Sequence, residues 1–451
     1  MTQDARSLAF EILTTFDKNA DATLDSVMDR ITGKVELDRR EMGLANALVY
    51  GVLRHRGQLD YTIDHFATKG IARIDKKILT ILRIALFQLR FMDRIPESAA
   101  VNTAVEMAKV HASESSGGFV NALLRTCLRN PEEPSLEELA PEKKLAVTTS
   151  MPQWLVEKWI ARMGLEEAAA LCRASNDIAP ITVRTNTLKT TREELSKRLA
   201  PQVETLSPTP ASPLGLSFTS PKTPIFEMDA FKEGLFQVQD EAAQLIALMV
   251  NPKPGSRVLD VCAGVGGKSG HLAQVMENQG ELVSMDVEAY KLKSLAREMA
   301  RLGITNITTH ACDLTRESPD IIGGGFDAVL VDAPCSGLGV IRRNPDTKWK
   351  YFKRNATRHT KKQKAILSAA ARCVRPGGTL VYAVCSMEPE ENGAVVEAFL
   401  EKHTDFRMMK PFDAAPQGAE AFITPEGYVA PLPHKNGMDG FFAARMVREE
   451  K

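Results

Sequence analysis

The first part of the chain carries apolar side chains at the spacing of helices. Apolar residues recur every three to four positions at 8–16, 44–53 and 78–89, and no stretch alternates apolar and polar residues as a half-buried strand does. The pair Asn130-Pro131 ends the pattern. We therefore expect an all-α domain over residues 1–132, whose cations lie either on solvated helix faces or on a surface that contacts phosphate.

The stretch at 141–250 mixes helical and strand patterns. A helix is expected to begin at Pro152, because proline suits the first turn of a helix. The run at 181–186 predicts a strand, and the proline-rich sequence at 201–224 predicts a long loop or an irregular hairpin. A further helix is expected at 241–250. This part of the chain is therefore expected to form a small α+β connecting domain.

From residue 251 the pattern changes to strand, turn and helix in alternation. Strands are predicted at 257–261, 281–286, 307–311, 327–331, 379–384 and 441–447, and helices at 268–276, 288–302, 361–374 and 390–402. Such alternation is typical of a mostly parallel sheet with helices on both faces. We expect residues 251–451 to form a Rossmann-like α/β domain.

Composition limits the partners and the compartment. Lys and Arg together number 57, as do Asp and Glu, so any surface that binds nucleic acid must be local. The seven cysteines include no C-x-x-C pair, which favours reduced thiols. The chain opens without an apolar signal segment, and no apolar run approaches the roughly 20 residues that span a bilayer. We expect a cytoplasmic protein with no metal ion and no membrane partner.

The first strand of the α/β domain leads into a glycine-rich turn, DVCAGVGGKS at 260–269. Glycines let the backbone approach a ligand closely, and the start of the next helix offers free N–H groups. A Walker phosphate loop requires glycine where Cys262 stands. A dinucleotide fingerprint accepts Gly264 and Gly266 but requires glycine where Ser269 stands. Both motifs therefore fail by one residue.

Three aspartates close successive predicted strands and favour a third ligand, S-adenosylmethionine. Asp286 is placed to accept hydrogen bonds from two ribose hydroxyls, and Asp313 to hold an adenine amino group. Carboxylates in series suit a cationic sulfonium better than a triphosphate, although each aspartate alone is also a common turn cap. The expected cofactor-binding residues are Cys262, Ala263, Gly264, Val265, Gly266, Gly267, Lys268, Asp286, Asp313 and Asp332.

Two cysteines follow predicted buried strands. Cys335 lies in the DAPCSG segment at 332–337, and Cys385 lies in the YAVCS segment at 382–386. The carboxyl ends of strands in an open α/β sheet face the ligand crevice. Two thiols at that place favour covalent chemistry, with one attacking and the other assisting. The alternative is that both are inert, as most buried cysteines are.

Taken together, these segments resemble the RsmB/NOP family of S-adenosylmethionine-dependent RNA cytosine-5 methyltransferases. The resemblance is carried by DVCAGVGGK at 260–268, DAPCSGLG at 332–339, YAVCSMEPEEN at 382–392, FQVQDEAAQ at 236–244 and DGFFAA at 439–444. The segments LANALVYGVLR at 44–54 and FVNALLR at 119–125 look like the NusB-type domain that precedes the catalytic part of the bacterial small-subunit rRNA enzymes in this family.

The resemblance implies a fold with three domains: a NusB-like helical RNA-binding domain at 1–132, a connecting RNA-binding subdomain at 141–250, and a class I methyltransferase domain at 251–451. Two departures from the family pattern bear on cofactor geometry rather than on the reaction. Gly264-Val265 replaces the usual Ala-Pro, which loosens the loop, and Val384 replaces the usual threonine.

The resemblance also implies roles for the residues. Cys385 would attack carbon 6 of a cytosine, Cys335 would help to remove the carbon 5 proton, and Asp332 would hydrogen-bond the ring nitrogen. The expected partner is 16S rRNA, bound by a monomer that does not bind DNA. A DNA cytosine-5 enzyme would attack with Cys335 alone, leaving Cys385 unexplained. A tRNA cytosine-5 methyltransferase and a non-catalytic RNA-binding assembly factor remain alternatives.

A basic segment at 341–366 follows the Cys335 turn and contains one acidic residue, Asp346. Its cations are Arg342, Arg343, Lys348, Lys350, Lys353, Arg354, Arg358, Lys361, Lys362 and Lys364, with Trp349, Tyr351 and Phe352 among them. Cations that contact phosphate and rings that stack on bases predict an RNA-binding loop. The alternative is a solvated helix face.

Overall fold

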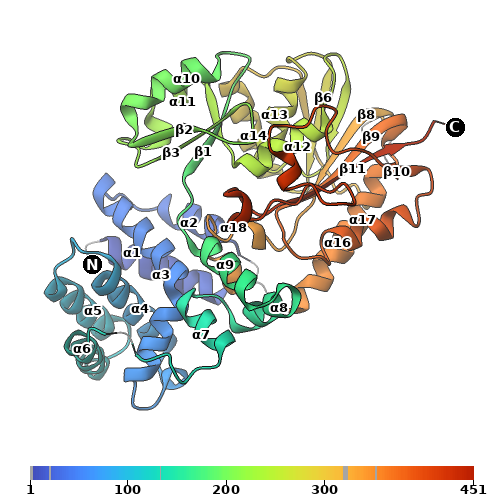
Figure 1. Ribbon diagram of the computed structural model, residues 1–451. Helices are drawn as coiled ribbons and strands as arrows, with labels where there is room; N and C mark the ends of the chain where they lie inside the picture. The colour runs from blue at the N-terminus through green and yellow to red at the C-terminus, as the bar shows by residue number, and fades with distance from the viewer. Residues whose placement is uncertain (1–3, 20–21, 133, 318–322, 351–352, 451) are drawn as a thin grey trace. The chain divides into compact units, whose positions relative to one another are not determined.

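The computed structural model describes residues 4–19, 22–132, 134–317, 323–350 and 353–450. The chain divides into two compact units (Figure 1). The first unit comprises Met1–Asp177 and Ile341–Tyr351, and the second comprises Ile178–Val340 and Phe352–Lys451. A short piece of the chain that follows the Cys335 turn therefore belongs to the first unit.

The first unit is helical. Its helices are α1 (Ala5–Lys18), α2 (Leu24–Thr32), α3 (Arg39–Phe66), α4 (Lys76–Phe91), α5 (Glu97–His111), α6 (Glu114–Arg129), α7 (Pro141–Thr148), α8 (Gln153–Met163), α9 (Leu165–Asn176) and the short α15 (Thr347–Lys350). Polar caps begin several of them: the Asp4 side chain, for example, accepts a hydrogen bond of 2.8 Å from the N–H of Ser7. The apolar stripes of α1 and α3–α6 pack into one core.

The second unit begins with an antiparallel sheet of four strands in the order β2-β3-β1-β4. Its elements are β1 (Ile181–Thr185), α10 (Arg192–Leu199), β2 (Thr205–Pro208), β3 (Gly215–Thr219), α11 (Asp229–Lys232) and β4 (Phe236–Val238). Strands β2 and β3 pair as a hairpin, so the proline-rich stretch forms the irregular hairpin that was one of its two predicted structures.

The remainder of the second unit is a seven-stranded sheet in the order β10-β11-β9-β8-β5-β6-β7. Strands β5 to β9 are parallel, and β11 and β10 are antiparallel at one edge. The strands are β5 (Arg257–Asp260), β6 (Glu281–Asp286), β7 (Ile307–Ala311), β8 (Phe326–Asp332), β9 (Val374–Val384), β10 (Phe406–Met408) and β11 (Phe442–Arg448). The helices are α12 (Glu241–Val250), α13 (Gly267–Val275), α14 (Ala289–Leu302), α16 (Lys353–Ala371), α17 (Gly393–Leu400) and α18 (Pro433–Asn436).

Both faces of this sheet are buried. Val258 and Leu330 belong to one core, with residues of α12, α13 and α14, whereas their neighbours Leu259 and Val329 belong to the other, with residues of α16 and α17. Successive side chains of a strand point to opposite faces, so strands covered on both sides read as continuous apolar runs. This explains why the central strands could be recognised in the sequence.

The observed bounds of the predicted helices in this domain differ from the expected ones, most of all at 361–374. The helix expected at 361–374 runs instead over Lys353–Ala371, and Val374 already pairs with Phe326 at the start of β9. The prediction was wrong at this end because the apolar run at 373–374 continues the helical spacing while its backbone joins the sheet: the N–H of Phe326 donates to the carbonyl of Cys373 at 2.8 Å.

Candidate active site

A cavity of about 340 Å³ opens at the carboxyl ends of the parallel strands. This is where open α/β sheets bind ligands, and the volume suits a small molecule. Among the residues predicted to form the site, Cys262, Gly264, Asp286, Asp313, Asp332, Cys335 and Cys385 line the cavity. Ala263, Val265, Gly266, Gly267 and Lys268 belong to the same turn or to the helix after it but are not among the lining residues.

Two glycines in the turn before α13 have backbone conformations that other residues rarely adopt. Gly266 has a φ of +91°, and a Cβ atom there would lie 2.7 Å from Leu295 Cγ, so backbone conformation and space both exclude a side chain. Gly264, with a φ of +56°, donates its N–H to Asp286 Oδ2 at 3.0 Å. The turn is thereby held against the end of β6. Val265, in contrast, is exposed.

The carboxylates of Asp286 and Asp313 are oriented by backbone amides. Asp286 Oδ1 accepts from the N–H of Glu288 at 2.9 Å. Asp313 Oδ1 accepts from the hydroxyl of Thr315 at 2.6 Å and from its N–H at 3.0 Å, and the hydroxyl bond lowers the pKa of Asp313. The cavity therefore carries oriented acceptors on the side formed by β6 and β7.

The two cysteine thiols are in contact. Strands β8 and β9 are neighbours, with Asp332 opposite Ala383, and the turns that follow bring Cys335 Sγ to 3.3 Å from Cys385 Sγ. The hydrogen bond with Cys385, followed by burial and the negative charge of Glu391, raises the pKa of Cys335 well above its ordinary value. The two thiols can exchange a proton, and both can contact the same group of a bound ligand.

An ion pair lies beside the thiols. Lys268 Nζ is 2.7 Å from Asp332 Oδ2 and 4.9 Å from the ring centre of Phe441. Burial opposes the charge on Lys268, yet the carboxylate of Asp332 outweighs that effect, so the pKa of Lys268 is raised. Its positive charge also interacts with Cys385. The side chain of Lys268 thus extends from the glycine-rich turn at 260–269 toward Asp332 and Cys385.

Cys262 lines the cavity, whereas the neighbouring Asp260 is not among its lining residues. Burial raises the pKa of the Cys262 thiol, which makes it a poor nucleophile. Asp260 is fully buried, its Oδ2 accepts from the Ser269 hydroxyl at 2.7 Å, and burial raises its pKa to about 7. The Asp260 carboxylate thus supports the first turn of α13, on which Ser269 lies.

Sequence reasoning missed the residue that connects the two cysteine turns. Glu391 is fully buried and accepts hydrogen bonds from Ser336 and Ser386, the residues that follow Cys335 and Cys385. The segment that contains it also holds Glu388 and Glu390. Nothing in the local sequence shows which of the three has this position, because Ser336 comes from the end of another strand.

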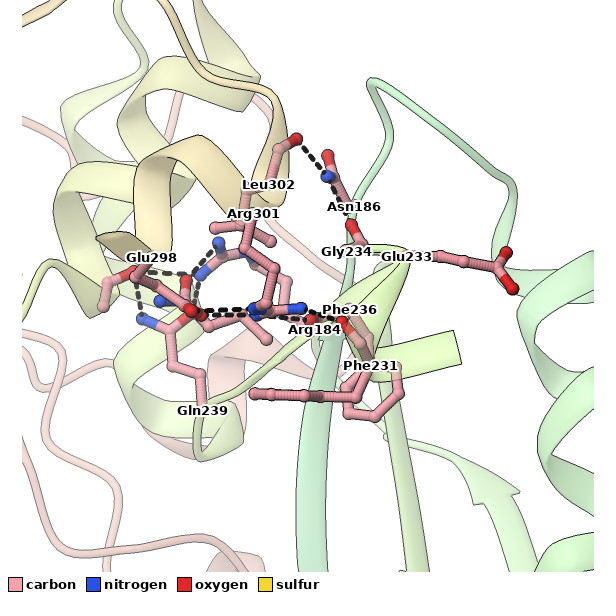
Figure 2. A network of polar contacts seen from close by, with 12 residues as sticks. Arg184, Asn186, Phe231, Glu233, Gly234, Phe236, Gln239, Glu298, Arg301 and Leu302 are labelled. Atoms are coloured by element: carbon pink, nitrogen blue, oxygen red, sulfur yellow. Dashed lines mark hydrogen bonds and ion pairs between the residues drawn. The ribbon is translucent and has the colours of Figure 1, made fainter. Parts of the chain in front are cut away.

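A buried arginine connects the four-stranded sheet to the end of the glycine-rich turn at 260–269. Arg184, on β1, donates to the carbonyl of Gly267 at 3.0 Å and to Gln274 and Gln237 at 2.7 Å each, and also bonds the Gln239 side chain. Figure 2 shows Arg184 and Gln239 within one network of polar contacts. Burial lowers the pKa of Arg184 to about 9. The small domain therefore holds the start of α13 in place.

The basic segment after Cys335 is only partly available to RNA. Lys348 is buried in the first unit and donates to the carbonyl of Arg54 at 3.0 Å and to Asn176 Oδ1 at 2.7 Å. Trp349 Nε1 donates to the carbonyl of Leu53 at 2.7 Å, and Lys350 Nζ donates to that of Phe16 at 2.6 Å. The predicted RNA contact is therefore wrong for Lys348.

The rest of the segment differs. Tyr351 and Phe352 lie outside the described residues. On α16, Arg358, Lys361 and Lys362 are exposed, and Lys362 lines the cavity. The exposed cations therefore lie on the helix, close to the site.

Two properties concern the described ranges as a whole. None of the helices there combines the length and the apolar character that crossing a membrane requires. The same ranges contain no group of three or more His, Cys, Asp or Glu side chains placed to hold a metal ion.

Three family models match the chain in consecutive parts. Residues 3–129 match the NusB family, residues 151–225 match the ferredoxin-like domain of RsmF/B-like methyltransferases, and residues 247–447 match the family described as 16S rRNA methyltransferase RsmB/F. The predicted fold, with a NusB-like helical domain, a small α+β domain and a Rossmann-like domain, is confirmed.

Similar proteins match over nearly the full length. A Synechocystis protein, the probable ribosomal RNA small subunit methyltransferase B, is 36% identical over 98% of this chain and 99% of its own. A Bacillus subtilis protein of the same name is 34% identical over 98% of both chains. The crystal structure of PH0851 is 27% identical and covers 99% of this chain and 100% of its own, with a TM-score of 0.80. The chain belongs to the RsmB/F family of 16S rRNA methyltransferases.

Proposed function

We propose that this protein transfers a methyl group from S-adenosylmethionine to carbon 5 of a cytosine in 16S rRNA, through a transient bond between Cys385 and the base. The observation that carries the proposal is the contact of Cys335 with Cys385, 3.3 Å apart in a cavity that also holds Asp332. The names of the full-length relatives, which are small-subunit rRNA methyltransferases, support the choice of RNA.

The donor set of the cavity suits S-adenosylmethionine. Asp286 and Asp313 provide oriented acceptors for hydroxyl and amino groups, and their negative charge favours a cation. The glycines at 264 and 266 let the backbone of the turn approach the ligand. When bound, S-adenosylmethionine supplies an electrophilic methyl group.

Cys385 is the nucleophile in this scheme. Carbon 5 of cytosine is too weak a nucleophile to take a methyl group unaided, and addition of a thiolate to carbon 6 makes it an enamine carbon. The ammonium group of Lys268 interacts electrostatically with Cys385 and is placed to balance the negative charge of an attacking sulfur. The negative charge of Glu391 instead raises the pKa of Cys335 and so disfavours its thiolate. These charges favour Cys385 as the attacking residue.

Asp332 and Cys335 complete the reaction. The proton released by the Cys385 thiol is taken up at the ring nitrogen as the adduct forms. Asp332, whose Oδ2 is bonded to Lys268, accepts a hydrogen bond from that N–H and stabilises the adduct. After Cys335 has released its own proton to solvent, its thiolate takes the proton from carbon 5. The electrons of that bond re-form the double bond between carbons 5 and 6, and Cys385 leaves as a thiolate. A raised pKa makes Cys335 a strong base in this step.

The RNA must present an unstacked base to reach this cavity. Arg358, Lys361 and Lys362 on α16 are exposed beside it, and we assign them to phosphates that flank the target.

Bisulfite sequencing of 16S rRNA and tRNA from a strain that lacks the gene tests the proposal. We expect one cytosine of 16S rRNA to lose its protection, and only the wild-type gene, not the Cys385→Ala variant, to restore it. Loss of protection in tRNA alone would assign a different substrate, and unchanged protection in both RNAs would reject the proposed activity.

A further inference from the structure

The side chain of Glu391 is surrounded by hydrogen-bond donors. It lies in the turn between β9 and α17 and is fully buried. Its Oε1 accepts from the N–H of Ser336 at 2.9 Å and from Gln363 Nε2 at 3.2 Å. Its Oε2 accepts from the hydroxyls of Ser336 and Ser386 at 2.5 Å each. A carboxylate has about four acceptor sites, so these four donors saturate it.

These partners place the carboxylate between the two cysteine turns. Ser336 directly follows Cys335, and Ser386 directly follows Cys385. The two serine hydroxyls are also 3.1 Å from each other. One side chain therefore connects two turns that are 50 residues apart in the sequence, at the position next to each thiol.

The backbone of Glu391 is fixed as well. The Tyr382 hydroxyl, on β9, donates to the carbonyl of Glu391 at 2.7 Å, and Asn392 Nδ2 donates to the carbonyl of Ser386 at 3.2 Å. Gln363, which donates to Glu391, also donates to the carbonyl of Pro334 at 3.1 Å. The network therefore supports the residues on both sides of Cys335 and Cys385.

We propose that Glu391 is the positioning residue of the two-thiol site: it fixes the turns of Cys335 and Cys385 so that both sulfurs meet the same base. This inference rests on the proposed function, because the spacing of the thiols matters only when both act on one ring. A buried carboxylate is costly unless its bonds are complete, and a complete buried network specifies one geometry. An error of about 1 Å in placing reacting groups can cost about 100-fold in rate.

Two variants separate the hydrogen bonds of Glu391 from its charge. Glu391→Ala removes all four bonds, so we expect kcat to fall about 100-fold while the KM values for RNA and S-adenosylmethionine stay within a few-fold. Glu391→Gln keeps a planar group whose oxygen accepts from Ser336 N and Gln363, and whose amide donates to the two serine hydroxyls, which can accept. We expect it to recover most of the lost kcat.

Binding of phenylarsine oxide provides a readout that does not depend on methyl transfer. The arsenic atom bridges two thiols only when they are close together. We expect the wild-type protein to bind it at the pair, the Cys335→Ala and Cys385→Ala variants to lose this binding, Glu391→Ala to weaken it at least tenfold, and Glu391→Gln to retain it. This result supports the positioning role even if the protein does not methylate cytosine.

A matched control separates positioning from stability. Glu241 on α12 is also a buried carboxylate, bonded to the N–H of Ser212 at 2.8 Å, and it does not line the cavity. Glu241→Ala should lower the melting temperature yet leave arsenical binding unchanged. Undiminished arsenical binding by Glu391→Ala would overturn the proposal, as would equal loss of binding in Glu241→Ala. If Glu391→Ala does not fold, Ser386→Ala decides: weaker binding supports the proposal and unchanged binding rejects it.

Discussion

Cys335 Sγ lies 3.3 Å from Cys385 Sγ, although 50 residues separate the two cysteines in the chain. The contact follows from the sheet: β8 and β9 are parallel neighbours, and both cysteines lie just beyond their carboxyl ends. Two sulfurs in contact can act on adjacent atoms of one ring. This relationship leads to separate expectations for the two thiols.

Replacing Cys385 should stop the reaction before a methyl group moves. Cys385→Ala removes the nucleophile, so we expect methyl transfer to fall to background. The carboxylates that we propose to hold the cofactor are untouched, so the affinity for S-adenosylmethionine, measured by calorimetry, should stay within about twofold of the wild type. Full activity in a tritium-transfer assay would exclude Cys385 as the attacking residue.

Replacing Cys335 should stop the reaction after the bond to RNA has formed. In Cys335→Ala the base that removes the carbon 5 proton is missing, so the covalent adduct should accumulate. It would appear as a slower band on a denaturing gel when RNA and S-adenosylmethionine are both present. The double variant Cys335→Ala/Cys385→Ala is the control and should give no such band. Absence of the adduct in the single variant would point to another release mechanism.

Asp286 tests the cofactor site. Loss of a hydrogen bond to a charged group costs about 1.5–3 kcal/mol, so Asp286→Ala should weaken the binding of S-adenosylmethionine about 10- to 100-fold by calorimetry. Asp405→Ala is a suitable control, because that carboxylate pairs with Arg448 at 3.0 Å and does not line the cavity. Equal affinities in the two variants would reject the role of Asp286.

Asp260 should make stability depend on pH. Burial raises its pKa from 3.8 to about 7, so between these values the folded protein holds a proton that the unfolded chain has lost. The stabilising contribution is therefore complete below about pH 4 and is lost as the pH rises through about 7. Asp260→Asn stays neutral, so its stability relative to the wild type should increase over this range. Urea unfolding at pH 5 and pH 8 measures the difference; parallel changes in both proteins would contradict it.

Much of the fold could be predicted because its signals are local. Central strands such as β5 and β8 are buried on both faces and therefore appear as short apolar runs, and the turns between them contain the glycines and aspartates of the cavity. The order of strand and helix then places Asp286, Asp332 and Cys385 at one edge of the sheet. Local patterns were thus enough to predict that these candidate residues lie together at one edge of the sheet.

The remaining contacts depend on partners far away in the sequence. Lys348 lies in a run of cations typical of an exposed surface, yet its carbonyl partner belongs to Arg54, 294 residues earlier. Lys268 was assigned to the cofactor turn, and its ammonium group instead meets Asp332, 64 residues later. Glu391 acquires its position only when two turns come together. Periodicity reports which face of an element is buried, not which distant group meets it.

The bond from Arg184 to the carbonyl of Gly267 has a consequence for any attempt to isolate the catalytic part. A fragment that begins at residue 251 would lack the bond from Arg184 to Gly267, at the start of α13, and the bond from Arg184 to Gln274. The shortest piece that retains these bonds begins before β1, close to Ile178. Likewise, a hybrid enzyme in which the connecting domain is replaced by that of a relative needs an arginine at the position of Arg184.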